Sequence, residues 1–341
     1  MTEFSVEEEI NQILINRPHV VILGAGASRV VCPSGDKNGK VLPLMNDFIS
    51  VLELDYLEDF GFDINENFEV IYSSMYQKKI YKEIRLRVED QVYKYFDDIQ
   101  IPESPTIYDL LLLSLRKKDL VATFNWDPLI VQAYRRNGNK FDLPNLLFLH
   151  GNVGAGFCES HIQNGLKGFP CNVCGNLLEK TPLLYPIIEK NYDSNGFLNS
   201  QWKTLQHYVK SAFWITFFGY SAPESDTRAI DLMKFAWGEV KERNMEQIEI
   251  IDITPEEELR KSELWEPFIH SHHYDIYRHF FESWMANHPR RTGEAYHNQY
   301  KANRFIHSNH IPRHLSFEEL WDWFEPLHEV EHQQPGTTMN R

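Results

Sequence analysis

The stretch His19–Val31 reads HVVILGAGASRVV and joins a run of apolar residues to a turn of small ones. The apolar run has the composition of a buried strand, and the Gly-Ala-Gly-Ala-Ser turn would open a helix. Gly24 and Gly26 permit a tight turn and a close backbone approach, and amides at the start of a helix can bind a diphosphate. Arg29 stands where the dinucleotide-binding fingerprint has its third glycine. A tight turn without a phosphate is therefore the alternative.

This pattern recurs along the chain, where short apolar runs end in small or polar residues. The runs are LVATFNWD, NLLFLHG, WITFFGYS and IEIID, beginning at Leu120, Asn145, Trp214 and Ile248 respectively. Segments with helical periodicity separate them, which predicts an α/β fold with a Rossmann-like parallel sheet and helices on both faces. Ligands of such sheets bind outside the carboxyl ends of the strands, so we expect the residues after each run to meet there.

The chain divides into segments of different pattern. We expect residues 1–285 to form the main domain, with a helical insertion at 60–100 and a small zinc hook at 151–180. A helical C-terminal extension at 286–330 and a disordered tail at 331–341 would follow. The apolar positions that predict the helical insertion are Ile71, Met75, Ile80, Ile84, Val88, Val92 and Phe96.

Composition limits the kinds of partner. The chain has 34 Lys and Arg against 49 Asp and Glu, a formal net charge of −15, which disfavours general attraction to nucleic acid. No apolar run approaches the roughly 18 to 20 residues of a membrane span, and no secretory signal is readable, so we expect a cytoplasmic protein. Residues 288–310 mix Arg, Lys, His and Tyr. We interpret them as a solvated helix or a subunit contact and do not expect direct nucleic-acid binding.

The cysteines provide a second constellation. Cys158 and His161 are three positions apart, and so are Cys171 and Cys174. Two such pairs suit a tetrahedral, structural zinc ion. The alternative is a turn with free thiols and an ordinary loop histidine. Cys32 lies outside the pattern, and we expect it to be simply buried.

Four short motifs now carry a family resemblance. GAGAS at 24–28, TFNWD at 123–127, LHG at 149–151 and GYS at 219–221 occur in the order in which sirtuins carry them, each at a predicted strand end. The chain resembles the sirtuin superfamily over residues 19 to about 255. Sirtuins also carry a paired-cysteine zinc module after the motif histidine, although here one cysteine is replaced by histidine.

The resemblance implies that NAD binds at the matching positions. They are Gly24, Ala25, Gly26 and Ser28 at the pyrophosphate, Asn125 and His150 at the nicotinamide ribose, Asp127 shaping the site, Gly219 and Ser221 at the phosphates or ribose from the opposite side, and Asp252 at the adenosine ribose. For Asp252 the alternative is a helix N-cap.

Two departures bear on the activity. Typical deacylating sirtuins carry Gln where Phe124 stands, and an Asp-Phe-Arg sequence where this chain has Asn46–Ile49, NDFI. The combination resembles divergent bacterial sirtuin-like proteins that hydrolyse NAD in antiphage defence. That resemblance implies an NAD glycohydrolase with NAD as substrate, restrained in a homo-oligomer or by a partner such as a HerA-like ATPase or a short Argonaute. The alternatives are an NAD-dependent protein deacylase and a non-catalytic sensor of NAD or ADP-ribose.

The chemistry is within reach of these residues. Nicotinamide leaves ribose as a neutral base, so cleavage needs no general acid but must stabilise an oxocarbenium-like ribose and deliver water. We hypothesise that His150 accepts a proton from water or a ribose hydroxyl and that Asn125 orients that group. The alternatives are a structural histidine and an Asx-turn at the end of a strand.

Overall fold

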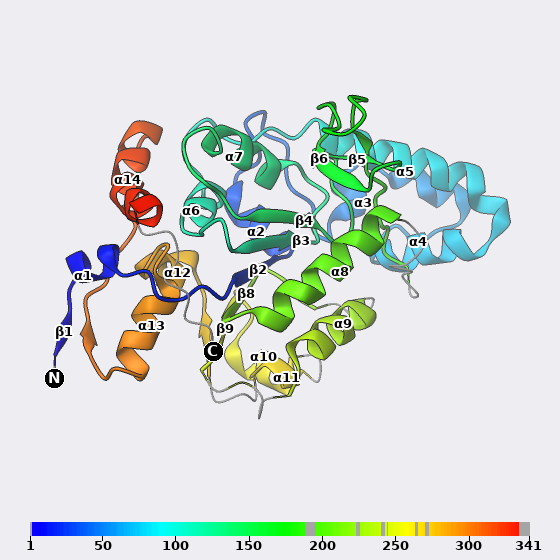
Figure 1. The fold of residues 1–341 in the computed structure, drawn as a ribbon. Coiled ribbons are helices and arrows are strands. Elements are labelled where there is room, and N and C mark those ends of the chain that lie inside the picture. The colour runs from blue at the N-terminus through cyan, green and yellow to red at the C-terminus, as the bar shows by residue number, and fades with distance from the viewer. Residues whose placement is uncertain are drawn as a thin grey trace.

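The computed structural model describes residues 2–187, 196–222, 226–239, 243, 245–262, 265–269 and 273–333. A six-stranded sheet lies at its centre, and all its neighbouring strands are parallel (Figure 1). In spatial order the strands are β10 (Tyr274–Tyr277), β9 (Gln247–Ile251), β8 (Trp214–Phe218), β2 (His19–Leu23), β3 (Leu120–Thr123) and β4 (Asn145–Phe148). The winding reverses between β2 and β8, which is the order of a doubly wound dinucleotide-binding sheet.

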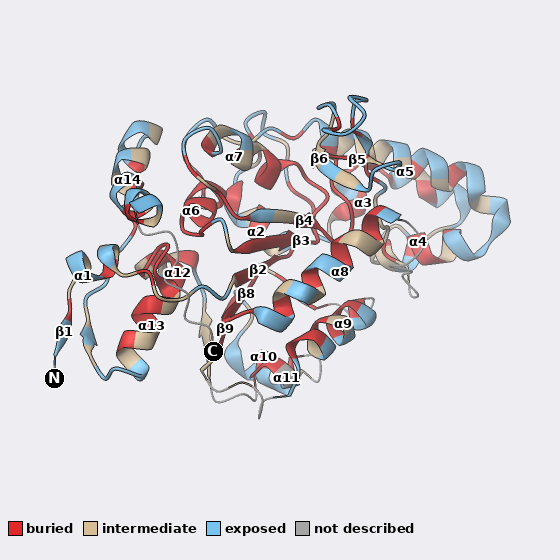
Figure 2. Cartoon of the chain, in the orientation of Figure 1, coloured by how far each residue is buried: buried red, intermediate tan, exposed pale blue. Residues whose placement is uncertain are grey.

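Alternate residues of each central strand pack into two separate cores. Val20 and Ile22 of β2 pack on one face of the sheet, and Val21 and Leu23 pack on the other. The helices on the Val20 face are α8 (Gly196–Ser211), α9 (Thr227–Trp237), α10 (Glu256–Lys261) and α11 (Glu266–Ile269). The helices on the Val21 face are α2 (Ala25–Val31), α6 (Ile107–Leu113), α7 (Leu129–Asn137) and α12 (Trp284–Asn287). Burial on both faces explains the apolar runs, and β2, β3, β8 and β9 are accordingly red in Figure 2. The predicted α/β fold class is confirmed.

Residues 48–97 form helices that extend from one side of the sheet (Figure 1). These elements are α3 (Phe48–Val51), η1 (Asp55–Phe60), α4 (Phe68–Gln77), η2 (Lys79–Tyr81) and α5 (Lys82–Asp97). Six of the seven apolar positions named above are buried, but Ile80 is 84% exposed. The expectation for Ile80 is wrong because the helix ends at Gln77 and a 3-10 turn follows, which breaks the four-residue period.

Residues 155–180 form a small antiparallel sheet next to the main one. Its strands are β6 (Gln163–Leu166), β5 (Ala155–Cys158) and β7 (Glu179–Lys180), with β5 in the middle. This sheet supports the cysteine-rich hook, which is described below.

The first and the last described elements of the chain meet on the side of the sheet opposite to α4 and α5 (Figure 1). The elements there are β1 (Glu3–Phe4), α1 (Val6–Asn11), η5 (Phe280–Glu282), α13 (Thr292–Tyr300), β11 (Phe305–Ile306) and α14 (Phe317–Gln333). Strand β1 pairs with β11, and α1 packs against α14. The boundary predicted at residue 285 stays a prediction. The disordered tail predicted from residue 331 begins too early, because α14 continues to Gln333, and its remainder from 334 onward lies outside the described residues.

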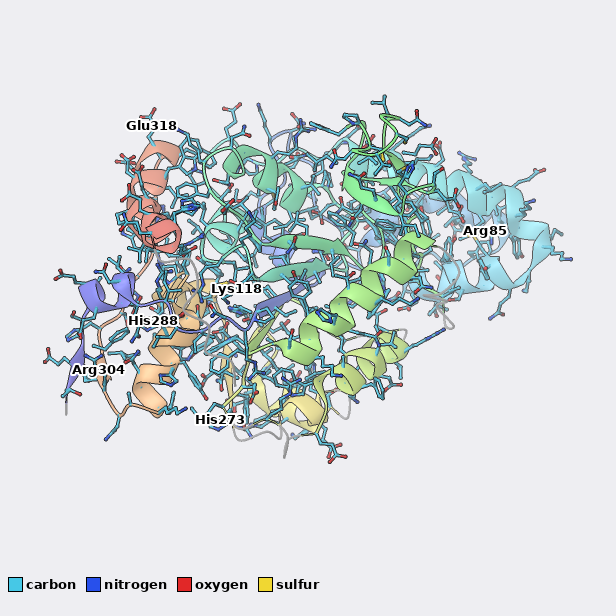
Figure 3. The ribbon with its side chains drawn as sticks, in the orientation of Figure 1. Arg85, Lys118, His273, His288, Arg304 and Glu318 are labelled. Atoms are coloured by element: carbon cyan, nitrogen blue, oxygen red, sulfur yellow. The ribbon has the colours of Figure 1, made fainter. Side chains whose placement is uncertain are left out.

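Of the two interpretations of residues 288–310, the solvated helix is wrong for residues 288–298, which are mostly buried, and the subunit contact stays a prediction. The side chains of Arg290 and Arg291 are fully buried and pair with Glu331 of α14 at 2.6 and 2.7 Å. His288 is buried beside Glu9 of α1, with 2.7 Å between Nδ1 and Oε2, and Figure 3 labels it on that side of the molecule. These charges therefore hold the two ends of the chain together. In the described part of the chain, no helix is long and apolar enough to cross a membrane.

Candidate functional site

The glycine turn after β2 lies against the turn after β8, at the point where the winding of the sheet reverses. Gly26 N donates to Gly219 O at 2.9 Å. A Cβ atom on Gly24 would lie 2.4 Å from Gly219 O, and one on Gly219 would lie 2.2 Å from Ala27 N. Gly219 also has a positive φ of 59°, which disfavours other residues. The glycines are thus required by backbone packing, and their contact with a phosphate stays a prediction.

Asn125 links the end of β3 to this glycine turn. Its Nδ2 donates to Gly24 O at 2.8 Å and to Ser28 Oγ at 2.9 Å. Because a carbonyl oxygen can only accept, the contact with Gly24 also fixes which end of the amide is nitrogen. Asn125 Oδ1 has no hydrogen-bond partner among the described residues, and it is not sealed from solvent. The amide therefore presents a fixed, accessible acceptor.

Asp127 joins the same hydrogen-bond network through Ser28. Its Oδ2 accepts from Ser28 Oγ at 2.7 Å, and its Oδ1 accepts from Leu129 N at the start of α7. The residue is 4% exposed, and burial raises the pKa of its carboxyl to about 6 although these two bonds favour the charged form. Asp127 thus orients Ser28 and caps a helix, at a cost in desolvation.

Two residues of this network escaped the sequence analysis. Tyr108 of α6 lies with its hydroxyl 2.8 Å from Ser28 Oγ and 3.3 Å from Asn125 Nδ2. Asn152 is fully buried and donates from Nδ2 to the carbonyl oxygens of Asn125 and Asp127, at 3.0 and 2.6 Å. Asn152 therefore joins the loop after β4 to the loop after β3. Its place directly behind the LHG motif was a usable signal, whereas nothing in the sequence marks Tyr108.

His150 lies at the end of β4 among aromatic and acidic neighbours. It is 7% exposed, and its Nε2 lies 3.7 Å from Asp226 Oδ1, at the start of α9. Asp226 in turn accepts from the Tyr220 hydroxyl at 3.1 Å through its other oxygen. The Phe124 ring stacks on Tyr220 with centroids 4.5 Å apart and meets the His150 ring edge-on at 4.7 Å. A histidine beside a carboxylate, shielded by rings, can accept a proton and be stabilised when charged.

Residues 181–184, which follow the hook, pass over the loop after β4 that carries His150. Leu184 N donates to His150 O at 2.8 Å, and Thr181 exchanges two hydrogen bonds with the backbone of Asn152. A Cβ atom on Gly151 would lie 2.0 Å from Pro182 O, and Gly151 has a φ of 78°. The third residue of the LHG motif is glycine because this returning segment crosses it.

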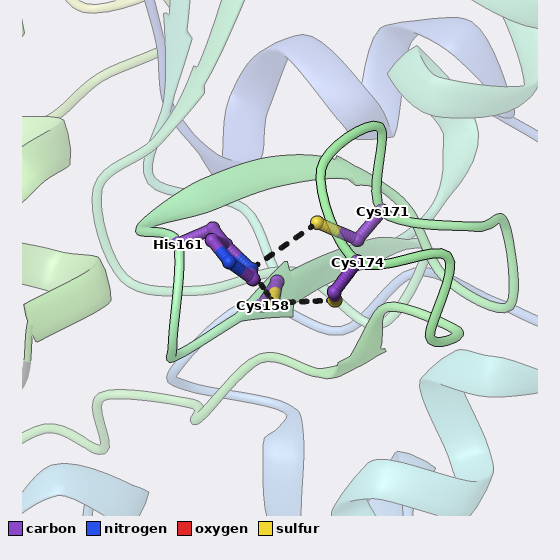
Figure 4. Close-up of side chains that lie close together, drawn as sticks. All are labelled: Cys158, His161, Cys171 and Cys174. Carbon is purple, nitrogen blue, oxygen red and sulfur yellow. Dashed lines mark hydrogen bonds between the residues drawn. The ribbon is translucent and has the colours of Figure 1, made fainter.

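The predicted ligands of the hook come together. Cys158 Sγ lies 3.4 Å from His161 Nδ1 and 3.9 Å from Cys174 Sγ, and Cys171 Sγ lies 3.7 Å from His161 Nδ1 (Figure 4). Bond lengths of about 2.3 Å for Zn–S and 2.0 Å for Zn–N place tetrahedral ligands about 3.5 to 3.8 Å apart. Backbone N–H groups of Cys174 and Val173 lower the pKa of Cys171 to about 6, which favours a thiolate ligand. The four donors therefore fit a tetrahedral metal ion.

The other three residues predicted to contact NAD, Ala25, Ser221 and Asp252, follow β2, β8 and β9 at the same edge of the sheet. Ala25 opens α2 and is exposed, and Ser221 is exposed directly after the Gly219 turn. Asp252 follows β9, and its Oδ1 accepts from Thr254 N at 2.8 Å. That bond is a local Asx-turn just ahead of α10, so its other carboxylate oxygen is the atom left for a ribose.

The chain was compared with known proteins. No family model matches it, and no curated protein matches it. A crystal structure of a Sir2 homologue in complex with NAD is similar over 82% of this chain and 90% of that one, with 17% identity and a TM-score of 0.40. A structure of Sir2 bound to acetylated peptide is similar over 84% of this chain and 94% of its own, with 14% identity and a TM-score of 0.36. At this level of similarity, a function has to be supported by the residues of the chain itself.

Proposed function

We propose that the protein binds NAD at the carboxyl edge of the sheet and hydrolyses it to nicotinamide and ADP-ribose. The supporting observation is that contacts of Asn125 and His150 bring together the segments that follow β2, β3, β4 and β8. Asn125 bonds to the turn after β2, its backbone bonds to the loop after β4, and His150 faces Asp226 after β8. This edge, at the reversal of winding, is where doubly wound sheets bind nucleotides.

Asn125 is proposed to orient the attacking group. Its Nδ2 is occupied by protein acceptors, so only Oδ1 is left for a water molecule or a ribose hydroxyl. Holding that group in one direction replaces a random encounter by a defined approach to the anomeric carbon C1′. Ser28, Tyr108 and Asp127 then act as positioning residues, because they fix the amide through hydrogen bonds.

His150 is proposed to act as the general base. As the bond between C1′ and the nicotinamide nitrogen breaks, its electron pair neutralises the pyridinium ring. Water forms the new bond to C1′ and gives a proton to His150. Asp226 lies 3.7 Å from Nε2 and stabilises the imidazolium that results. The products are nicotinamide, ADP-ribose and one proton, so no further reactant is needed.

Two contacts favour hydrolysis over deacylation. Phe124, which replaces the usual glutamine, is 8% exposed and held in the stack with Tyr220, so that position offers no hydrogen bond. In the segment that replaces Asp-Phe-Arg, Asp47 pairs with Arg29 at 3.0 Å and Phe48 is buried against Phe68. Phe124 and Phe48 therefore pack and Asp47 is held in an ion pair, and we infer that water is the acceptor of ADP-ribose.

The hook is proposed to hold a structural zinc ion, with Cys158, His161, Cys171 and Cys174 as its ligands. An ion with four protein ligands has no open position for substrate, so its contribution would be to folding. Through Thr181 and Leu184, the hook would also hold the loop that carries His150.

The test is the release of nicotinamide from NAD, measured with and without an acylated peptide. Release without peptide, with ADP-ribose as the second product, is the expected result. Release only with peptide would establish a deacylase instead. Binding of NAD without any release, also in the presence of a neighbouring gene product, would establish a sensor.

An enzyme that drains cellular NAD must be restrained. We propose that this protein acts in bacterial antiphage defence and that a homo-oligomer or a separate partner such as a HerA-like ATPase controls it. The expected result is that infected cells lose NAD when they carry the wild-type chain and keep it when they carry His150→Ala.

A further inference from the structure

A second group of metal-ligating side chains lies at the C-terminal end of α14, which α6 and α7 separate from the hook strands β5 and β6 (Figure 1). His328 and His332 belong to α14, and Asp142 belongs to the loop after α7. One donor atom from each lies within 4.8 Å of the other two. The proposed NAD chemistry uses none of the three.

The two histidines are positioned for a shared ligand. They are four residues apart, so they occupy the same face of the helix on successive turns. Their Nε2 atoms are 3.2 Å apart, and their rings meet at 80°. Two neighbouring ligand nitrogens about 2.0 to 2.1 Å from one metal ion lie about 2.8 to 3.4 Å apart in octahedral or tetrahedral geometry. The observed separation falls within this range.

The present contacts of the three side chains can be exchanged for an ion. His328 is half-buried, and its ring also meets the Phe141 ring edge-on at 5.1 Å, which helps to fix the direction of its imidazole. Its Nε2 accepts from Asp142 N at 3.0 Å, and an ion would take that lone pair in place of the amide. The Asp142 carboxylate lies 3.7 Å from Lys117 Nζ, an exposed pair that an ion can displace at little cost.

We propose that Asp142, His328 and His332 bind a divalent transition-metal ion. Two imidazoles and one carboxylate favour ions such as Zn²⁺, Ni²⁺ or Cu²⁺ over Mg²⁺ and Ca²⁺, which prefer oxygen ligands alone. Three protein ligands leave positions for water, so this ion exchanges more readily than one in the four-ligand hook. The bound ion joins the last turn of α14 to the loop after α7 and thereby stabilises the docking of the C-terminal helix.

The test uses Ni²⁺ as the probe on untagged, full-length protein whose zinc content has been measured first. Equilibrium dialysis should show one Ni²⁺ bound per chain in addition to that zinc, and Ni²⁺ should raise the melting temperature. His332→Ala removes an exposed side chain and should weaken this binding at least about tenfold, as should Asp142→Asn. His310→Ala, at an exposed histidine outside the cluster, is the matched control and should bind Ni²⁺ like the wild type.

Two results would overturn this proposal. Either wild-type protein takes up no Ni²⁺, or His332→Ala and Asp142→Asn both bind it with unchanged affinity. Melting curves without metal show whether each variant is folded, so a loss of binding cannot be confused with a loss of structure.

Discussion

Replacement of Asp127 by asparagine should stabilise the protein, and more strongly at high pH. The Asp127 carboxyl is buried, and its pKa is raised from 3.8 to about 6. A group that binds its proton more tightly when folded gives its full stabilisation below pH 3.8 and loses it as the pH rises through 6. Relative to low pH, the raised pKa therefore lowers the free energy of unfolding by about 3 kcal/mol at pH 8 and by about half of that at pH 5.

Asparagine carries no such cost and can keep the hydrogen bonds. Its Oδ1 would accept from Leu129 N, and its Nδ2 would donate to Ser28 Oγ, whose own proton can turn to Tyr108. Urea unfolding at pH 5 and pH 8 should show Asp127→Asn more stable than wild type at both values, with a difference about 1.5 kcal/mol larger at pH 8. Asp231→Asn, on the exposed face of α9, should show no such trend. A variant that is less stable than wild type at pH 8 would refute the argument.

Three further substitutions test other parts of the account. Asp226→Asn removes the charge beside the proposed base and should lower kcat for NAD cleavage about 10- to 100-fold with little change in KM, in steady-state assays; an unchanged kcat would contradict its role. Cys171→Ser should lose the zinc of the hook, measured by metal analysis, whereas Cys32→Ala should keep it; full zinc in both would contradict the ligand assignment. Gly24→Ala brings a Cβ against backbone atoms and should lower the free energy of unfolding by about 1 to 3 kcal/mol, while Gly196→Ala, where a Cβ meets nothing, should not; equal stabilities would count against the packing of the glycine turn.

The central sheet could be predicted because its strands are buried on both faces. Each strand from β2 to β9 in the sheet is mostly apolar, interrupted in β9 only by the buried Glu249, and ends in turn residues, a signal that needs no knowledge of distant contacts. Strand β10, with the sequence YDIY, was missed because an edge strand that is only half-buried alternates polar and apolar residues. The hook strands were missed because they are short and contain glycine and asparagine.

The site residues also fall into two groups, those that a local sequence pattern predicts and those that only distant contacts bring together. The ligands of the hook could be predicted because a metal ion requires particular side chains at short spacings. Tyr108 could not, because it reaches Ser28 across 80 residues of sequence, and only the packing of α6 against α2 brings them together. Arg290 and Arg291 were misinterpreted for a related reason, since a charged residue is expected at the surface unless its partner is known, and Glu331 lies about 40 residues away.

The most direct test of the central claim is the rate at which purified protein releases nicotinamide from NAD. Wild-type protein and His310→Ala should release nicotinamide and ADP-ribose in equal amounts, whereas Asn125→Ala and His150→Ala should be at least about 100-fold slower. Retained binding of NAD by these two variants would show that the loss lies in the chemical step. A wild-type rate in His150→Ala, or no release by wild-type protein under any of the conditions above, would contradict the account.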